Sequence, residues 1–364
     1  MKRTGLLLLI LAGAFSCLRE APGDGDLRLL SYQPQPLALE NPPAFVRMVI
    51  PADNPLTVEG VALGRRLFYD SILSADSSVS CATCHLPQLA FTDARAVSIG
   101  VDDVRGRRSS PSLPNVGDYY KGLFWDGRVG TLEEQAFHPV RDKTEMAMNW
   151  AEVENRLRNH PDYPVLFRRA FGIERTSQID SVLAARALAQ FQRTLVSSNA
   201  KFDRVKRGEA AFTAAEERGS HIFFDSSPAL PVSECVHCHS DPLFTNLDFF
   251  NNGIMPPAEQ RQTKDSGRVA VTGRLSDLHK FRTPTLRNIA LTAPYMHDGR
   301  FSTLEEVIDH YASGGHFAHN VNPNVRVLNL TDENKADLIA FLHTLTDSTA
   351  LLNPAFRRPV ELLD

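Results

Sequence analysis

Two copies of one short pattern, Cys-x-x-Cys-His, carry the clearest chemistry in this sequence. The cysteines and histidines of the two copies are Cys81, Cys84, His85, Cys235, Cys238 and His239. This pattern attaches a c-type haem, because the two thiols add to the haem vinyl groups and the adjoining histidine is then placed to ligate the iron. A zinc site would need further cysteines nearby, and the chain has only one more. The sequence therefore predicts two covalently bound haems c.

The two copies differ in the residues downstream of each motif. Each unit contains an Asp-Gly-Arg turn, at residues 126–128 and 298–300, and Tyr311 stands thirteen residues after Asp298 where Pro139 stands after Asp126. A tyrosine phenolate can ligate haem iron, whereas proline has no donor atom. We therefore expect an open first iron, able to bind and activate a small oxidant, and a closed second iron that stores or passes electrons.

Several side chains near the predicted open iron are chemically suited to act there. A carboxylate such as Glu145 could move a proton between the two oxygens of peroxide, although its spacing alone favours a solvated surface residue. Gln135 is a further candidate, and His138 is better explained by packing or hydrogen bonding than by ligation. Trp125 could relay charge between the haems, and a packed core aromatic is an equally good explanation.

Internal similarity indicates which elements position these residues. Three pairs of segments correspond: 57–70 with 213–225, 110–115 with 283–288, and 126–134 with 298–306. Thr57 and Thr213 begin the first segments as expected helix caps, and Thr131 and Thr303 cap a helix within the last segments. Further helical patterns lie at 150–158, 163–171, 179–195 and from Thr331 to about 345, and no sustained two-residue alternation predicts strands. The predicted fold is mostly α, with two cytochrome c-like haem domains related by internal duplication.

The predicted organisation is an N-terminal haem domain over 44–205, a C-terminal haem domain over 206–345 and a tail over 346–364. The sequence leaves open whether a final helix packs against the first domain. The 364 residues favour two domains, and 43% hydrophobic with 23% charged residues is typical of a soluble globular protein. A net charge of −4 argues against a nucleic-acid partner.

The first 17 residues are expected to be a signal peptide. Lys2 and Arg3 precede an apolar run over 5–15, which is too short to span a bilayer. The fifth cysteine, Cys17, ends this run at what looks like a relaxed bacterial lipoprotein cleavage box. We favour lipidation of Cys17 over ordinary signal cleavage, and expect residues 18–43 to form a tether. The sequence thus predicts a periplasmic protein that contacts the membrane only through this lipid anchor.

Three motif groups carry a family resemblance. Besides the two haem motifs, these are residues 124–128 (Phe-Trp-Asp-Gly-Arg), 132–135 (Leu-Glu-Glu-Gln) and 294–299 (Pro-Tyr-Met-His-Asp-Gly). The chain resembles the bacterial di-haem cytochrome c peroxidases, within them the MauG-like branch, from about residue 45 to 345.

The resemblance implies roles for individual residues. His85 looks like the proximal ligand of a peroxidatic haem and His239 like that of an electron-transfer haem. Trp125 matches the tryptophan between the haems. The distal side of the first haem is then expected to hold the glutamine, proline and acid–base glutamate of the family, which match Gln135, Pro139 and Glu145. A calcium ion between the domains would be bound partly by main-chain oxygens at Thr292 and Pro294.

Four positions depart from the classical pattern. Val101 stands where a distal histidine is usual, and Tyr311 where the second haem has an axial methionine, and both changes resemble the MauG branch. Ser233 replaces a tryptophan that this branch can carry, which argues against long-range hole transfer and quinone-cofactor maturation. Ser109 replaces an asparagine that helps to bind calcium.

These observations support three functional hypotheses. The leading one is an exported peroxidase that reduces hydrogen peroxide to water with electrons from a small cytochrome c or similar donor. The second is a MauG-like oxidase that acts on a protein or a small molecule. The third is an electron carrier with two closed haems, which needs a sixth ligand on the first iron that the sequence does not supply.

Overall fold

The computed structural model describes residues 24–362 and is mostly helical, as predicted. The signal peptide and Cys17 lie outside these residues. The α-helices are α1 (Val58–Tyr69), α2 (Cys81–Cys84), α3 (Leu132–Arg141), α4 (Trp150–Asn159), α5 (Tyr163–Phe171), α6 (Ser181–Thr194), α7 (Lys201–Lys206), α8 (Ala214–Phe223), α9 (Pro257–Gln260), α10 (Val269–Thr272), α11 (Leu304–Ala312), α12 (Asp332–His343) and α13 (Ser348–Leu352). The antiparallel pair β1 (Phe249–Phe250) and β2 (Phe281–Arg282) is the one sheet within the described range.

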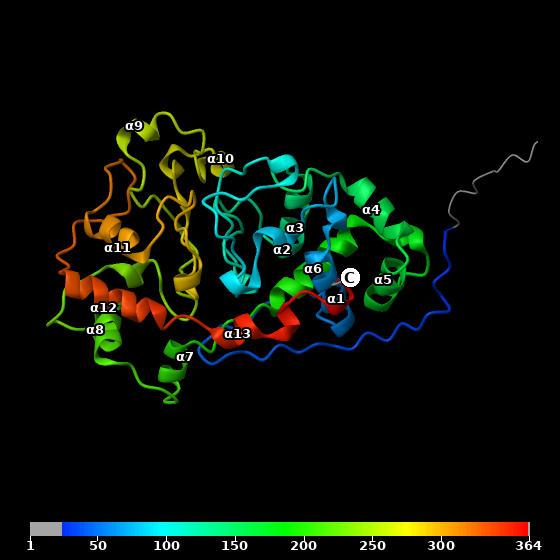
Figure 1. Ribbon diagram of the computed structural model, residues 1–364, viewed down its shortest axis with the longest axis horizontal. Coiled ribbons are helices and arrows are strands. Elements are labelled where there is room, and N and C mark those ends of the chain that lie inside the picture. Colours follow the sequence, from blue (N-terminus) through cyan, green and yellow to red (C-terminus); the bar gives the residue numbers. More distant parts are fainter. Residues whose placement is uncertain (1–23, 363–364) are drawn as a thin grey trace, which may run out of the picture.

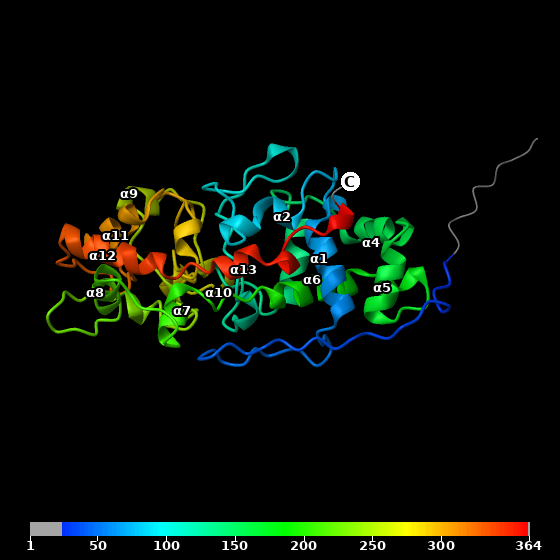
Figure 2. The same ribbon diagram turned by 60° about the horizontal axis from the view of Figure 1, so that its bottom comes forward.

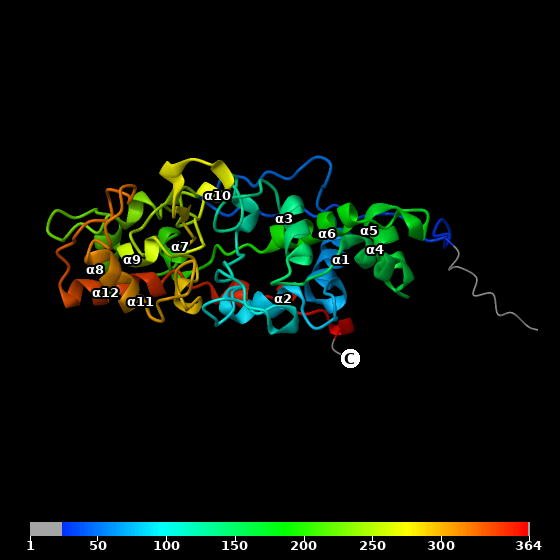
Figure 3. The same cartoon turned by 90° about the horizontal axis from the view of Figure 1, so that it is seen from above.

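The helices form two units that lie end to end along the long axis of the molecule (Figure 1). Viewed from above, α2 and α3 lie at the side of the N-terminal unit that faces the other unit (Figure 3). One hydrophobic cluster extends from Leu27 to Leu195 with a few later residues, and a second extends from Phe202 to Leu345. The change of core thus falls a few residues before the predicted boundary at 205.

Helix α1 packs closely across α6 in the N-terminal unit. Thr57 caps α1 by accepting the N–H of Gly60, and the apolar face of α1 carries the buried Leu63 and Leu67. A Cβ atom added to Gly64 would lie 1.8 Å from the carbonyl oxygen of Ala187. Only a glycine allows the two backbones to approach this closely.

Helices α8 and α12 repeat this arrangement in the C-terminal unit. Thr213 caps α8 by accepting the N–H of Glu216, whose carboxylate accepts the N–H of Thr213. A Cβ atom on Gly219 would lie 1.9 Å from the carbonyl oxygen of Asp337. The two haem motifs therefore come after helices that are held in the same way.

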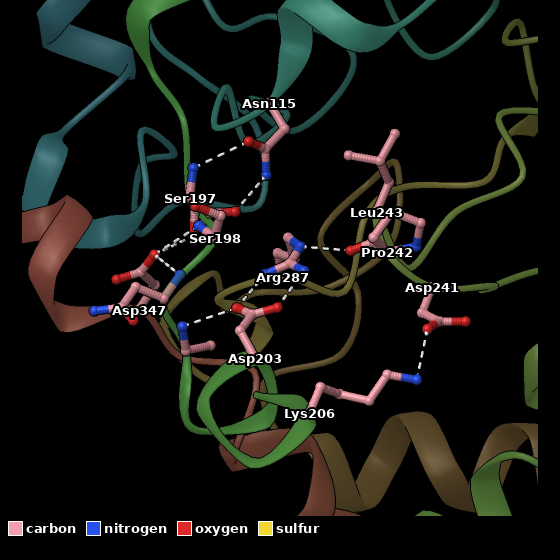
Figure 4. Close-up of polar contacts among 12 residues, drawn as sticks. Asn115, Ser197, Ser198, Asp203, Lys206, Asp241, Pro242, Leu243, Arg287 and Asp347 are labelled. Carbon is pink, nitrogen blue, oxygen red and sulfur yellow. Dashed lines mark hydrogen bonds and ion pairs between the residues drawn. The ribbon is translucent and has the colours of Figure 1, made fainter. Parts of the chain in front are cut away.

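The chain crosses between the units through a network of buried polar groups (Figure 4). Arg287, which is fully buried, forms two hydrogen bonds of 2.8 and 2.9 Å with the carboxylate of Asp203. The side chain of Asn115 both donates to and accepts from the backbone of Ser197. Asp347 accepts the N–H groups of Ser198 and Asn199, each at 2.9 Å. Because each buried group has a partner, breaking any of these contacts would leave an unsatisfied group.

The tail returns to the N-terminal unit. After α13 it passes α1, where Tyr69 donates to the carbonyl of Phe356 and Arg65 donates to that of Arg357 at 2.7 Å. Figure 2 shows this segment (red) leaving the C-terminal unit and ending beside α1. The last residues thus connect the units a second time.

Residues 24–43, the described part of the segment expected to be a tether, contact the N-terminal unit at a few positions. Asp26 forms an isolated antiparallel β-bridge with Arg175, and Leu27 is buried, whereas Leu29 is 97% exposed. Further along, the ring of Phe45 lies 4.9 Å from the guanidinium of Arg287. None of the helices in the part of the chain that the structure describes is long and apolar enough to cross a membrane.

Candidate active site

The first haem motif presents a histidine that is oriented for metal binding. His85 follows α2, and its Nδ1 lies 2.6 Å from the carbonyl oxygen of Phe91. Because a carbonyl only accepts, Nδ1 carries the proton and Nε2 is left to bind a metal. Burial lowers the pKa of His85, so the ring is neutral, as ligation requires.

A cavity of about 550 Å³ lies against this motif. It is lined by His85 and by both cysteines. Burial raises the pKa of the Cys81 thiol to about 12 and that of the Cys84 thiol to about 11. The volume is in the range of cofactor pockets, about 300–1,000 Å³. Two thiols and a neutral histidine at such a cavity fit a haem bound through two thioethers.

Helix α3 directs two of the predicted distal residues at the same cavity. Thr131 caps the helix by accepting the N–H of Glu134. Gln135 and Pro139 lie four residues apart, hence on one face, and both line the cavity. Proline offers no donor atom to an iron. His138 also lines the cavity, and its ring packs edge-on against Phe124 at 5.5 Å.

The loop after α3 places Glu145 at the cavity. Met146 donates to the carbonyl of Pro139, and Val101 donates to that of Glu145 at 2.8 Å. A Cβ atom on Gly100 would lie 2.4 Å from the Glu145 carbonyl oxygen. The Gly100–Val101 backbone therefore fixes the position of Glu145. The side chain of Val101 is buried in the hydrophobic core.

The carboxyl group of Glu145 is electrostatically unusual. Burial, helped by the negative charge of Asp142, raises its pKa to about 7, and the positive charge of Arg128 only partly opposes this. A carboxyl group with this pKa both accepts and releases a proton near neutral pH. The structure thus brings Glu145, Gln135 and Pro139 together around the cavity that His85 lines.

Trp125 lies between this cavity and the C-terminal unit. Its side chain lines the cavity and is 9% exposed. The indole N–H donates to the carbonyl of Ser109 at 2.8 Å, and the carbonyl of Trp125 accepts the N–H of Arg282 at 2.7 Å. The ring of His297 packs edge-on to the indole at 6.5 Å.

A series of short contacts continues from Trp125 into the C-terminal unit. The hydroxyl of Ser109 donates to the carbonyl of Met296 at 2.8 Å. The side-chain amide of Asn252 lies 3.5 Å from the sulfur of Met296 and donates to the hydroxyl of Tyr311 at 3.2 Å. Sequence reasoning missed Asn252, which belongs to no motif. Its only sequence signal is a place in a loop rich in asparagine and glycine.

The second haem motif has the same histidine geometry. Nδ1 of His239 lies 3.1 Å from the carbonyl of Phe244, and burial lowers the pKa of His239 to about 4. Burial raises the pKa of both cysteine thiols, Cys235 and Cys238, to about 11. Tyr311 lies on α11, and burial raises its pKa to about 12, with smaller contributions from the same two thiols. The phenol is therefore within electrostatic reach of the attachment cysteines.

The expected calcium ligands are only partly available. Within the described residues, no backbone N–H donates to the carbonyls of Thr292 and Pro294. The hydroxyl of Ser109, by contrast, is engaged with Met296. Two carbonyls fall short of the six to eight oxygens, roughly, that calcium takes, so these residues alone do not make the site.

Comparisons of this sequence with known proteins identify a family whose members carry two haems. The family model described as "Di-haem cytochrome c peroxidase" matches residues 58–211. The methylamine utilization protein MauG of Methylophilus methylotrophus is 38% identical over 298 residues, covering 81% of this chain and 84% of that protein. The cytochrome-c peroxidase IdrP1 of Denitromonas iodatirespirans is 32% identical, covering 95% and 94%.

A solved structure is also similar. The crystal structure of a MauG-like protein associated with microbial copper homeostasis superposes with a TM-score of 0.80 at 35% identity. The match covers 89% of this chain and 99% of that one.

Proposed function

The chain belongs to the di-haem cytochrome c peroxidase family, and from this premise we propose that it is an exported peroxidase that reduces hydrogen peroxide to water. Family membership implies two haems and a peroxidase-type oxidoreductase. The observation that carries the specific proposal is the shared cavity lined by His85 and by Glu145, Gln135 and Pro139.

In this proposal His85 and the two cysteines beside it hold the peroxidatic haem, which supplies an iron that binds and activates a small oxidant. The carboxylate of Glu145 accepts the proton of peroxide's near oxygen and returns it to the far oxygen, so that water can leave. The amide of Gln135 orients the bound oxidant by hydrogen bonding, and Pro139 keeps α3 from offering a competing ligand.

His239 and Tyr311 would hold the other haem, which would accept electrons from a small donor protein such as a cytochrome c. Trp125 would relay these electrons from the second unit to the first. The contacts through Ser109, Met296 and Asn252 support this route, because they join Tyr311 to the indole without a break.

The decisive experiment compares two assays. One measures steady-state peroxide consumption with a reduced cytochrome c as donor, and the other measures the oxidation of candidate protein substrates in the absence of that cytochrome. We expect peroxide reduction coupled to cytochrome oxidation. Because Val101 replaces a distal histidine, the fully ferric protein should also bind cyanide and react with peroxide at once. A lag that is relieved only by reducing the second haem would contradict an open first iron.

A MauG-like oxidase is the second candidate. The 38% identity to a MauG protein and the buried Tyr311, hydrogen-bonded to Asn252, favour it. A phenolate ligand stabilises ferric iron more than a thioether does, and it makes more oxidised states accessible. Oxidation of a protein substrate at a rate that exceeds cytochrome oxidation would select this candidate.

We expect Tyr311→Phe to change the spin state and optical spectrum of the second haem only. The variant removes the phenolate, and the Met296 thioether is one alternative donor, since Asn252 contacts both Met296 and Tyr311. A far-red charge-transfer band typical of methionine-ligated ferric haem should then appear only if Met296 moves onto the iron. A spectrum identical to that of the wild type would show that Tyr311 is not a ligand.

The remaining proposals concern organisation. Export to the periplasm, lipid attachment through Cys17 and a calcium ion bound partly by Thr292 and Pro294 rest on the sequence and the resemblance. We also propose that the two haem units arose by internal duplication. Matching left-handed residues at Asn115 and Asn288, each followed by a 3-10 turn, support that origin.

A further inference from the structure

Three side chains capable of binding metal meet at the surface of the C-terminal unit, outside the site described above. His237 lies between the two cysteines of the second haem motif and is half exposed. Asp225 follows α8, and Glu234 immediately precedes the motif. Their carboxylate and imidazole atoms all lie within 4.8 Å of one another. Neither the haem-binding role nor the proposed electron route uses any of the three.

The spacing of the three atoms suits a small divalent cation. Nδ1 of His237 lies 3.2 Å from a carboxylate oxygen of Glu234 and 4.0 Å from Oδ2 of Asp225. Tetrahedral ligands about 2.0–2.1 Å from zinc are about 3.3 Å apart. The pair formed by His237 and Glu234 already has this separation, and Oδ2 of Asp225 would have to move about 0.7 Å closer to His237.

The hydrogen bonds around the cluster leave one oxygen of each carboxylate for that ion. Oδ1 of Asp225 accepts the N–H of Ser233 at 2.7 Å, and Oε1 of Glu234 accepts from Arg326 at 2.6 Å. The other oxygen of Asp225 is buried and has no hydrogen-bond partner. A buried carboxylate oxygen without a partner is costly, and outer contacts of this kind commonly orient metal ligands.

We propose that Asp225, Glu234 and His237 form a binding site for a divalent transition cation such as Zn²⁺, with water completing the coordination. An imidazole nitrogen and carboxylate oxygens are both donor types that bind zinc in proteins. The nitrogen donor disfavours Mg²⁺ and Ca²⁺, which take oxygen ligands. Arg326 lowers the affinity by its charge, so the site is suited to reversible binding.

A cation bound here would act on the neighbouring haem. His237 is covalently next to Cys238, and the charge of Asp225 already contributes to raising the pKa of the Cys235 thiol. Neutralising Asp225 and Glu234 with a divalent cation makes the surroundings of the second haem more positive. The bound ion should therefore raise the reduction potential of that haem, because the reduced form carries one positive charge fewer.

The test of binding is equilibrium dialysis of the haem-loaded protein against Zn²⁺, with metal content measured per chain. We expect one ion per wild-type chain at micromolar zinc, unaffected by millimolar Mg²⁺. Asp225→Asn and His237→Gln should each weaken binding at least tenfold. The exposed His319 lies outside the cluster, so His319→Gln is the matched control and should bind as the wild type does. Asp225→Asn keeps the acceptor for Ser233, so it should fold.

Absence of stoichiometric zinc, or affinity that is the same in all four proteins, would overturn the site and leave His237 as an ordinary neighbour of the two carboxylates. The second readout is a redox titration of the second haem with and without saturating zinc. Its potential should rise in the wild type and not in His237→Gln, and an unchanged wild-type potential would overturn the coupling. Both readouts are made without peroxide, so failure of the peroxidase proposal cannot mimic either result.

Discussion

Glu145→Gln should leave both haems attached and slow peroxide reduction by roughly 100-fold or more, the usual scale of general acid–base catalysis. The amide keeps the size of the side chain, but it cannot accept the proton from peroxide. The measurement is the rate of peroxide consumption under saturating electron donor, with the haem content of each preparation determined from its optical spectrum.

The matched control is Glu152→Gln, which makes the same chemical change on the exposed surface of α4. It should retain wild-type turnover, because Glu152 does not line the cavity. If Glu145→Gln also turned over at the wild-type rate, Glu145 would have no part in proton transfer, and the cavity would need another base.

The pH dependence of the reaction is set by the same residue. Glu145 has a pKa raised to about 7 by burial, and the ionised form is the one that accepts a proton. Peroxide reduction should therefore rise as the pH increases through about 7 and fall as the pH drops below it. In Glu145→Gln this limb of the profile should disappear, while limbs due to other groups remain.

Trp125→Phe should preserve the reaction of peroxide at the first haem and uncouple the second haem from it. Phenylalanine is much harder to oxidise than an indole and has no N–H to donate to Ser109. Stopped-flow spectra after peroxide is added should show the change confined to one haem, and turnover with a cytochrome donor should slow accordingly. A spectral change at both haems at an unchanged rate would show that Trp125 does not relay charge and only packs in the core.

Trp150→Phe is the control for this variant. Trp150 is also buried, and its indole N–H likewise donates to a carbonyl, that of Phe137. Both variants should lose stability by about 1–3 kcal/mol, because each leaves a carbonyl without its donor and a small void. Of the two tryptophans, Trp125 is the one between the two units. We therefore expect only Trp125→Phe to confine the spectral change after peroxide addition to one haem.

The sequence determined those features that depend on neighbours along the chain. The four cysteines and two histidines that we propose to hold the haems are specified by a five-residue pattern. The helices that begin after Thr57, Thr131 and Thr213 are specified by capping, in which a side chain satisfies the N–H of a residue three positions on. The bounds of the helices after Thr57 and Thr213 agree with the predicted segments to within two residues, and no end was predicted for the helix after Thr131.

The tertiary structure determined those features of the site that depend on contacts between residues far apart in the chain. Position in the chain alone favoured a surface site for Glu145, and the family resemblance reversed that expectation. The contacts of its loop with α3 and Val101 hold it at the cavity, where burial raises its pKa. The donation from Asn252 to Tyr311 joins residues 59 positions apart. No periodic pattern encodes such a pair, because it arises from the packing of a loop against a helix.

The packing of the chain termini was decided in the same way. Residues 24–43 have the composition of a linker, yet Leu27 and Leu30 pack against the hydrophobic cluster of the N-terminal unit. The grouping of Asp225, Glu234 and His237 likewise required the turn after α8 to return beside the second haem motif. Local chemistry thus predicted the cofactor and its attachment, whereas long-range packing determined which residues line the cavity beside the first motif.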